Sequence, residues 1–321
     1  MKQFWREVGA AVILGMIMPG VILQIVTFSA HRHIREPDQA QNFTQTQDPA
    51  VYIPVLKSDG QVMELELETY ITGVVLAEMP ASFEPEALKA QSVVVRTYTL
   101  RARDGKSKHD SAAVCTESSC CQAYRSPEDY VRSGGSEENV VKVRHAVTNT
   151  AGQVLTYKGE LIEATYFSCS GGSTEDAVAV WGAEIPYLQA VSSPNEEKAT
   201  YFTDSVSFTL EELTKRLEIE MTESLSDWFT DVTYTAGGGV DTIRIGGRKF
   251  AGTELRKLLN LRSTAFTITT EGDSVTFHTR GFGHRVGMSQ YGADAMAAAG
   301  SDYREILDHY YQGTVLEDRS D

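Results

Sequence analysis

The strongest hydrophobic pattern in the chain lies in residues 67–100. In its first half, one set of residues recurs at the spacing of an α-helix face and ends in a carboxylate: Leu67, Ile71, Val74, Val75 and Glu78. Pro80 disfavours helical backbone at the residue before it, so this helix is predicted to end near Met79. Glu78 would then lie in the last turn, facing the core, where burial and the negative end of the helix both raise a carboxyl pKa. A raised pKa suits a general acid; the competing interpretation is a surface glutamate at a frayed helix end.

A second helix is predicted to follow after a short turn. Pro85 suits its first turn, and Ser82 is the expected cap. Two polar residues, Gln91 and Arg96, interrupt an otherwise small and apolar helix. The short turn could bring Glu78 close to one of them.

The rest of the chain mixes strand and helix patterns without regular alternation. A strand, a turn and a second strand precede the first helix, and Thr209 and Glu212 are spaced as a capping box. Periodicity and turn residues predict further elements: helices at residues 138–149, 209–217, 253–259 and 302–311, a small-residue helix that ends near Gly300, and a hairpin at residues 153–167. This order predicts an α+β fold with a candidate lateral subdomain at residues 204–278.

The amino-terminal region has the pattern of a membrane segment. Residues 8–30 carry no charged side chain and are long enough to cross a bilayer as one helix. We expect an uncleaved anchor at residues 1–35 with its amino terminus in the cytoplasm; a cleaved signal peptide is the alternative. Residues 36–50 are polar and are expected to form a linker to an ectodomain at residues 51–321.

The composition argues against nucleic acid as a partner. The 321 residues carry a formal net charge of −15, and no basic run stands out. With 41% hydrophobic residues, the chain can bury a sizeable core.

A polar loop carries a second candidate site. His109, Cys115, Cys120 and Cys121 lie within it. Cysteine and histidine are the usual ligands of structural zinc, and four of them complete a tetrahedral site. The alternative is a disulfide within the loop that leaves one thiol over. We expect a zinc ion here to fix the loop rather than to take part in chemistry.

Short motifs follow one another along residues 51–316. They read Gly-Val-Val-x-x-Glu-Met-Pro at 73–80, Ala-Leu-Lys-Ala-Gln-Ser at 87–92, Ser-Cys-Ser-Gly-Gly at 168–172, Pro-Tyr-Leu at 186–188 and Gly-Phe-Gly-His-Arg-Val-Gly-Met-Ser-Gln-Tyr-Gly-Ala at 281–293. Together they resemble the stage II sporulation protein D (SpoIID/LytB) family. The resemblance implies a membrane-anchored, extracytoplasmic lytic transglycosylase that cleaves peptidoglycan between muramic acid and glucosamine. It also implies a role in forespore engulfment, peptide-stripped glycan strands as substrate, and a complex with an amidase, stage II sporulation protein P, and with protein M.

The resemblance assigns candidate roles to residues of this chain. Glu78 is expected to protonate the glycosidic oxygen and then to accept the proton of the muramyl 6-hydroxyl, which leaves a 1,6-anhydro sugar. Arg96 occupies the position of an arginine that is functionally important in the family. The alternative is an arginine that pairs with a carboxylate within the fold. Where many relatives carry a basic residue, this chain has Gln189. The predicted substrate contacts are Gln91, Arg96, Ser168, Tyr187 as a stacking ring, His284, Ser289 and Gln290. The alternatives are ordinary core packing for Tyr187 and a tight turn with locally satisfied polar groups for the last three.

Three alternatives stay open. A second acid, Glu175 or Asp176, would allow hydrolysis instead of transglycosylation. Cys169 and His284 could form a cysteine peptidase that cuts stem peptides, although Cys169 follows a strand and lacks a helix amino terminus to lower its pKa. The chain could also bind the wall without catalysis.

Overall fold

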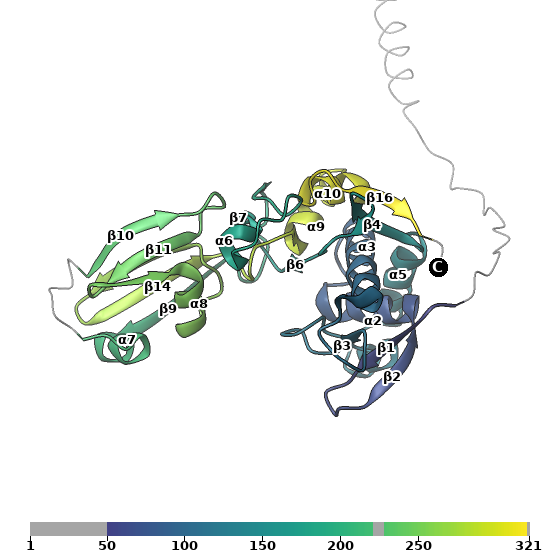
Figure 1. Ribbon diagram of the computed structural model, residues 1–321, viewed down its shortest axis with the longest axis horizontal. Helices are drawn as coiled ribbons and strands as arrows, with labels where there is room; N and C mark the ends of the chain where they lie inside the picture. The colour runs from purple at the N-terminus through teal and green to yellow at the C-terminus, as the bar shows by residue number, and fades with distance from the viewer. Residues whose placement is uncertain (1–49, 221–227, 320–321) are drawn as a thin grey trace, which may run out of the picture. The chain divides into compact units, whose positions relative to one another are not determined.

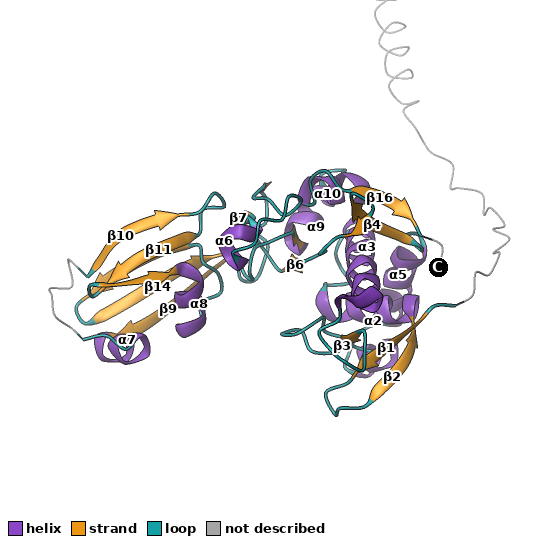
Figure 2. Ribbon diagram, viewed as in Figure 1, coloured by secondary structure: helices purple, strands orange, loops and turns teal. Residues whose placement is uncertain are grey.

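The computed structural model describes residues 50–220 and 228–319, which form an α+β fold (Figures 1 and 2). The predicted anchor at residues 1–35, and all of the predicted linker except its last residue, lie outside the described residues. Among the residues described, no helix is long and apolar enough to cross a membrane.

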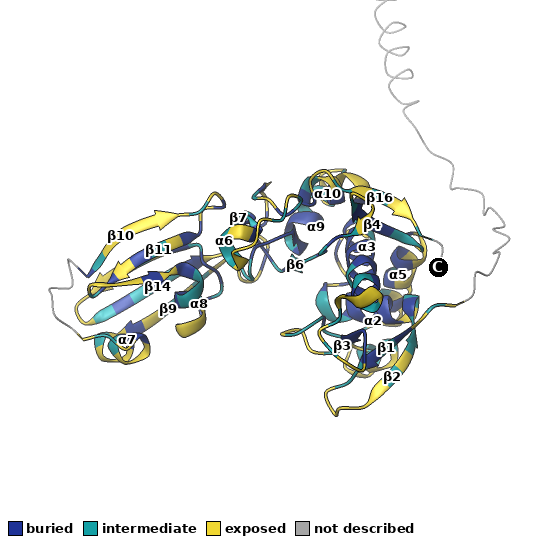
Figure 3. Cartoon of the chain, in the orientation of Figure 1, coloured by how far each residue is buried: buried dark blue, intermediate teal, exposed yellow. Residues whose placement is uncertain are grey.

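The first hydrophobic core is built around α3 (Pro85–Arg101), which contacts α2 (Leu67–Glu78) and α5 (Glu137–Thr148). Most of α3 is buried (Figure 3), so its polar side chains must find partners inside the protein. Ser92, Thr97 and Thr99 donate their hydroxyl groups to backbone carbonyls four residues earlier, at 2.7–2.8 Å. Because these side chains are small and form their hydrogen bonds within the helix itself, α3 can lie at the centre of this core.

Short sheets and further helices complete this part of the protein. Two three-stranded sheets have the strand orders β2-β1-β3 and β16-β4-β5, and β15 pairs in parallel with β6. Their strands are β1 (Tyr52–Leu56), β2 (Val62–Glu66), β3 (Val114–Cys115), β4 (Gln153–Tyr157), β5 (Glu160–Leu161), β6 (Tyr166–Phe167), β15 (Met288–Ser289) and β16 (Val315–Asp318). The remaining elements are α4 (Pro127–Arg132), α6 (Ala177–Trp181), α9 (Gln290–Ala298), α10 (Tyr303–Tyr310), the π-helical turn η1 (Ala102–Lys106) and the pair β7 (Gly172–Ser173) and β8 (Ser192–Ser193).

A second hydrophobic core lies between Phe208 and Phe277. It includes the fully buried Trp228 and belongs to two sheets, with strand orders β10-β11-β12 and β13-β14-β9. The elements are β9 (Thr203–Thr209), α7 (Leu210–Leu217), β10 (Phe229–Tyr234), β11 (Val240–Ile245), β12 (Arg248–Ala251), α8 (Gly252–Leu258), β13 (Phe266–Glu271) and β14 (Ser274–Arg280). These elements fall largely within the candidate subdomain at residues 204–278. The boundaries of that subdomain remain a prediction.

Two local predictions differ from the structure. The cap of α3 is Glu84, which makes no side-chain capping bond, and Ser82 is not the cap. The predicted hairpin at residues 153–167 is shorter, because β5 ends at Leu161 and the following β6 pairs with the distant β15. The capping box of Thr209 and Glu212 is confirmed at the start of α7.

Candidate active site

Glu78 is the last residue of α2, and its side chain is half-buried. The chain turns to extended backbone at Met79, next to Pro80, as the sequence predicts. Burial raises the pKa of the Glu78 carboxyl above its ordinary value, whereas a hydrogen bond from the Ala123 backbone N–H to Oε1, at 2.5 Å, opposes this shift. Because burial is the larger effect, Glu78 binds a proton more tightly than a glutamate in water does.

The Glu78 side chain lies on a cavity of about 780 Å³. The cavity is bordered by α2, the loop at residues 108–122, the segment at residues 163–168, α6 and the glycine-rich segment before α9. The residues that line it are Glu78, Tyr98, Lys108, Ser118, Ser119, Cys120, Cys121, Gln122, Glu163, Ala164, Thr165, Tyr166, Phe167, Ser168, Trp181, Phe282, Gly283, His284 and Gln290. Its size and its mixed polar and aromatic lining suit a polar organic ligand that has apolar faces.

Four consecutive residues, Cys120 to Ala123, join two parts of the site. Cys120 and Cys121 belong to the predicted metal cluster, whereas the Ala123 N–H holds Glu78. Between them, Gln122 is buried and donates from Nε2 to the Tyr166 hydroxyl at 3.3 Å. The position of this segment therefore determines the surroundings of the Glu78 carboxyl.

The four predicted metal ligands come together. The Sγ and Nε2 atoms of Cys115, Cys120, Cys121 and His109 all lie within 4.8 Å of one another. His109 Nε2 is 3.6 Å from Cys120 Sγ and 3.4 Å from Cys121 Sγ, and the latter two sulfur atoms are 3.9 Å apart. Tetrahedral zinc bonds imply about 3.6 Å between sulfur and nitrogen and about 3.8 Å between two sulfurs. These three distances agree with tetrahedral zinc, and the four residues together could hold a metal ion. The structure describes all four cysteines of the chain as free thiols.

Three of the predicted substrate contacts line the cavity together with Glu78: Ser168, His284 and Gln290. Gln290 is 6% exposed, and its Nε2 has no hydrogen-bond partner among the described residues. A buried amide donor without a partner is costly unless a ligand or water accepts its bond. His284 is held in the neutral state, because burial and the nearby Arg256 lower its pKa to about 4.

The other predicted contacts do not line the cavity. Arg96 is fully buried, and its Nε and Nη2 donate to the Glu68 carboxylate at 2.9 and 2.6 Å, which is the pairing within the fold that the sequence left as the alternative. Gln91 is fully buried in α3, and its side-chain amide has no hydrogen-bond partner among the described residues.

Tyr187 and Ser289 have partners within the protein. The ring of Tyr187 packs on Tyr157 with a centroid distance of 5.4 Å, and its hydroxyl accepts a bond from the Glu163 N–H. The Ser289 hydroxyl caps α9 by accepting a bond from the Gly292 N–H at 3.2 Å.

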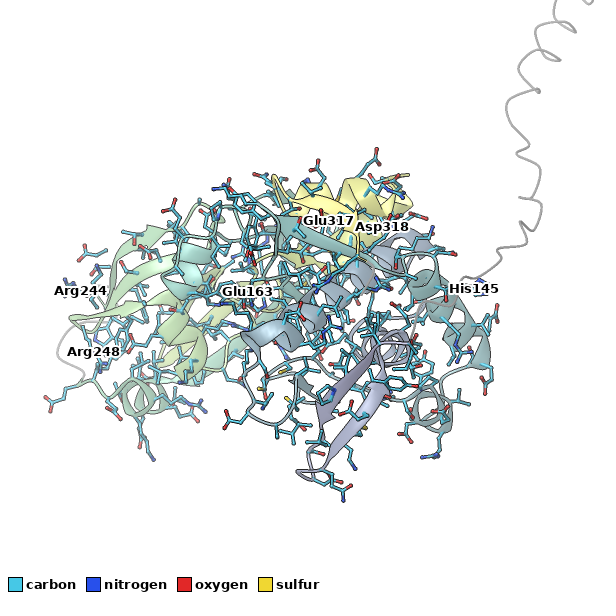
Figure 4. The ribbon with its side chains drawn as sticks, turned by 45° about the vertical axis from the view of Figure 1, so that its right-hand side comes forward. His145, Glu163, Arg244, Arg248, Glu317 and Asp318 are labelled. Carbon is cyan, nitrogen blue, oxygen red and sulfur yellow. The ribbon has the colours of Figure 1, made fainter. Side chains whose placement is uncertain are left out.

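The two candidate second acids also point into the fold. Glu175 is 1% exposed, pairs with Arg285 at 3.1 Å and accepts a bond from the Gly239 N–H. Asp176 accepts a bond from the Ala190 N–H, and neither acid lines the cavity. The second carboxylate among the described lining residues is that of Glu163, a residue labelled in Figure 4. Glu163 precedes β6 and pairs with Arg101 at 3.0 Å.

Cys169 is fully buried and does not line the cavity. Burial, with the Glu196 carboxylate nearby, raises the pKa of its thiol to about 12. A nucleophilic cysteine needs the opposite shift and an open path to its substrate. The geometry therefore argues against a peptidase that uses Cys169.

Trp181, Glu163 and Lys108 also line the cavity, although none of them is among the residues predicted from the sequence. No local pattern marks them, because they come from three segments that only the fold brings together.

Comparison with known proteins finds the same family that the sequence motifs resemble. A family model described as stage II sporulation protein (SpoIID) matches residues 57–157. The chain is 34% identical to stage II sporulation protein D of Bacillus subtilis (strain 168) over 99% of this chain and 96% of that protein. It is 37% identical to the protein of the same name from Bacillus amyloliquefaciens over 84% of this chain and 79% of that protein.

A third relative is the amidase enhancer of Bacillus subtilis (strain 168), which is 30% identical over 77% of this chain and 40% of that protein. The similarity to the two sporulation proteins extends through most of the chain, well beyond the segment that the family model matches. The chain belongs to the stage II sporulation protein D family.

Proposed function

We propose that the chain is a lytic transglycosylase that cleaves the glycan strands of peptidoglycan, with Glu78 as its acid and base. The observation that carries the proposal is the half-buried carboxyl of Glu78, whose pKa is raised and which lies on a cavity of about 780 Å³. A carboxyl that keeps its proton closer to neutral pH is suited to donate it to a leaving group.

The reaction needs only one such group. Glu78 gives its proton to the glycosidic oxygen while the bond between that oxygen and C1 of the muramyl sugar breaks. The 6-hydroxyl of the same sugar then bonds to C1, and its proton goes to the Glu78 carboxylate. The acid is restored, no water is consumed, and the product ends in a 1,6-anhydro sugar.

A zinc ion at His109, Cys115, Cys120 and Cys121 would act on the structure of the site. Its closed set of four ligands leaves no position for a substrate. Cys120 and Cys121 immediately precede the residues that hold Tyr166 and Glu78 in place. The bound ion would therefore fix the Glu78 hydrogen bond rather than take part in the reaction.

The biological setting is also a proposal. The relatives are named for sporulation, and one is named an amidase enhancer. These names support a link to sporulation and to the processing of peptidoglycan. A role in forespore engulfment, peptide-stripped strands as substrate, and the amidase stage II sporulation protein P and protein M as partners are what the resemblance of the motifs implies. The uncharged stretch at residues 8–30 supports a membrane anchor with the catalytic part outside the membrane.

Turnover of peptide-free glycan strands by matched variants tests the assignment of Glu78. Glu78→Gln keeps the size of the side chain and the acceptor for the Ala123 N–H, but it cannot cycle a proton; the full chain should lose nearly all activity. Glu163→Gln is the matched control, because it neutralises the other carboxylate of the cavity. If Glu163→Gln abolishes turnover and Glu78→Gln does not, the assignment is wrong. If the wild-type chain binds strands without cutting them, it is a wall-binding module.

A further inference from the structure

Trp181 leaves a large aromatic ring open on the cavity. It is the last residue of the five-residue helix α6, and it is 42% exposed. Gly182 follows with a φ of 72°, and this left-handed turn ends the helix directly after the tryptophan. The other tryptophan in the described residues, Trp228, is 1% exposed within the second core. An open tryptophan on a cavity wall is typical of a ligand contact.

The Trp181 ring is supported by a row of aromatic side chains. His284 lies 5.6 Å from Trp181 and 5.6 Å from Phe167, measured between ring centroids. All three side chains line the cavity. Because the row extends from α6 to β6, the ring has a defined position that does not depend on a ligand.

His284 acts as a support in this row. Its Nδ1 accepts a bond from the Val286 N–H at 3.1 Å, and the ring also bonds to the backbone of Tyr166. Nδ1 of the imidazole is therefore occupied within the protein. Trp181 is the exposed ring of this row, at 42%, whereas Phe167 is 5% exposed.

We propose that Trp181 is a saccharide subsite of the cavity, on which the C–H face of one pyranose ring of the glycan strand stacks. This inference rests on the proposed function, because it takes the strand as the ligand. A pyranose ring has an apolar face and a rim of hydroxyl groups. Nε2 of Gln290, which has no hydrogen-bond partner within residues 50–220 and 228–319, offers a donor to such a rim within the same cavity. Trp181 thus takes the stacking role that the sequence assigned to Tyr187.

Binding measured without turnover tests the subsite. The full chain carrying Glu78→Gln is titrated calorimetrically with peptide-free oligosaccharides of alternating glucosamine and muramic acid. Trp181→Ala is added to this parent, Trp181→Phe serves as the conservative variant, and Tyr234→Ala is the matched control. Tyr234 is an aromatic residue on β10 that is 62% exposed and does not line the cavity.

We expect Trp181→Ala to weaken binding roughly tenfold, which equals about 1.4 kcal/mol. Trp181→Phe should recover most of the affinity, and Tyr234→Ala should match the parent. Equal affinities for the parent and Trp181→Ala would overturn the subsite while leaving the role of Glu78 intact. A parent that binds no oligosaccharide would overturn it as well. If the wild-type chain cuts nothing but Trp181→Ala still loses affinity, the subsite stands and the proposed reaction fails.

Discussion

Replacing Arg96 tests whether this residue holds the fold together or contacts the substrate. The buried guanidinium forms a two-pronged pair with Glu68 and donates to the Val147 and Gln153 carbonyls at 3.2 and 3.3 Å. It therefore joins α3 to α2, α5 and β4. Arg96→Met removes every donor while it keeps much of the side-chain volume.

The expected loss of stability follows from the exposure of the partner. Breaking a buried ion pair costs about 3–5 kcal/mol when the remaining charge stays buried. Glu68 is 31% exposed, so water can solvate its carboxylate, and the expected cost falls to about 2–3 kcal/mol. Since 1 kcal/mol shifts Tm by about 2–4 °C in chains of 150–250 residues, the Tm should fall by about 4–12 °C.

Thermal unfolding of the full chain by circular dichroism measures this shift. Turnover of peptide-free glycan is measured at a temperature well below both midpoints, and we expect kcat/KM to stay close to the wild-type value. Glu68→Gln, the control, weakens the same pair from the other side and should lower Tm while turnover persists. An unchanged Tm together with lost turnover would refute the structural role. It would indicate instead that Arg96 contacts the substrate.

The remaining predictions concern Glu78 and the metal cluster. Because burial raises the pKa of Glu78 in the folded state, its contribution to stability is greatest below its ordinary pKa of 4.5 and falls as pH rises through the raised value. Glu78→Gln should therefore raise the free energy of unfolding at pH 7 relative to wild type and leave it unchanged at about pH 4, as checked by urea unfolding; identical pH dependence in both proteins would contradict the shift. The chain purified with zinc should contain about one zinc per molecule, and Cys121→Ser and chelation should each lower Tm. Mass spectrometry and thermal unfolding measure both effects, and a disulfide among these cysteines would refute the site.

Local sequence patterns were sufficient to predict α2 and the position of Glu78. The apolar spacing and Pro80 act within a dozen residues, so neither depends on the rest of the fold. The metal ligands could be predicted as well, because His109 and the three cysteines lie in one short segment of the chain, although Cys115 belongs to β3. These parts of the site are local.

The cavity itself could not be predicted, because its lining comes from segments far apart in the chain. Ser289 and Gln290 are neighbours in one polar, glycine-rich motif, yet the first caps α9 and the second lies on the cavity. Tyr187 and Trp181 show the same limit: the motif pointed to Tyr187, which packs on Tyr157, whereas Trp181 is the open ring. Only the tertiary structure distinguishes such pairs.

The central claim is that Glu78 promotes attack by the sugar's own hydroxyl group rather than by water. Digestion of peptide-free glycan strands in ¹⁸O-labelled water, followed by mass spectrometry of the product ends, tests it most directly. We expect ends that are one water lighter than a reducing sugar and carry no ¹⁸O, with no product from Glu78→Gln. Reducing ends that contain ¹⁸O would mean hydrolysis, and Glu163 would then become the candidate for the second carboxylate.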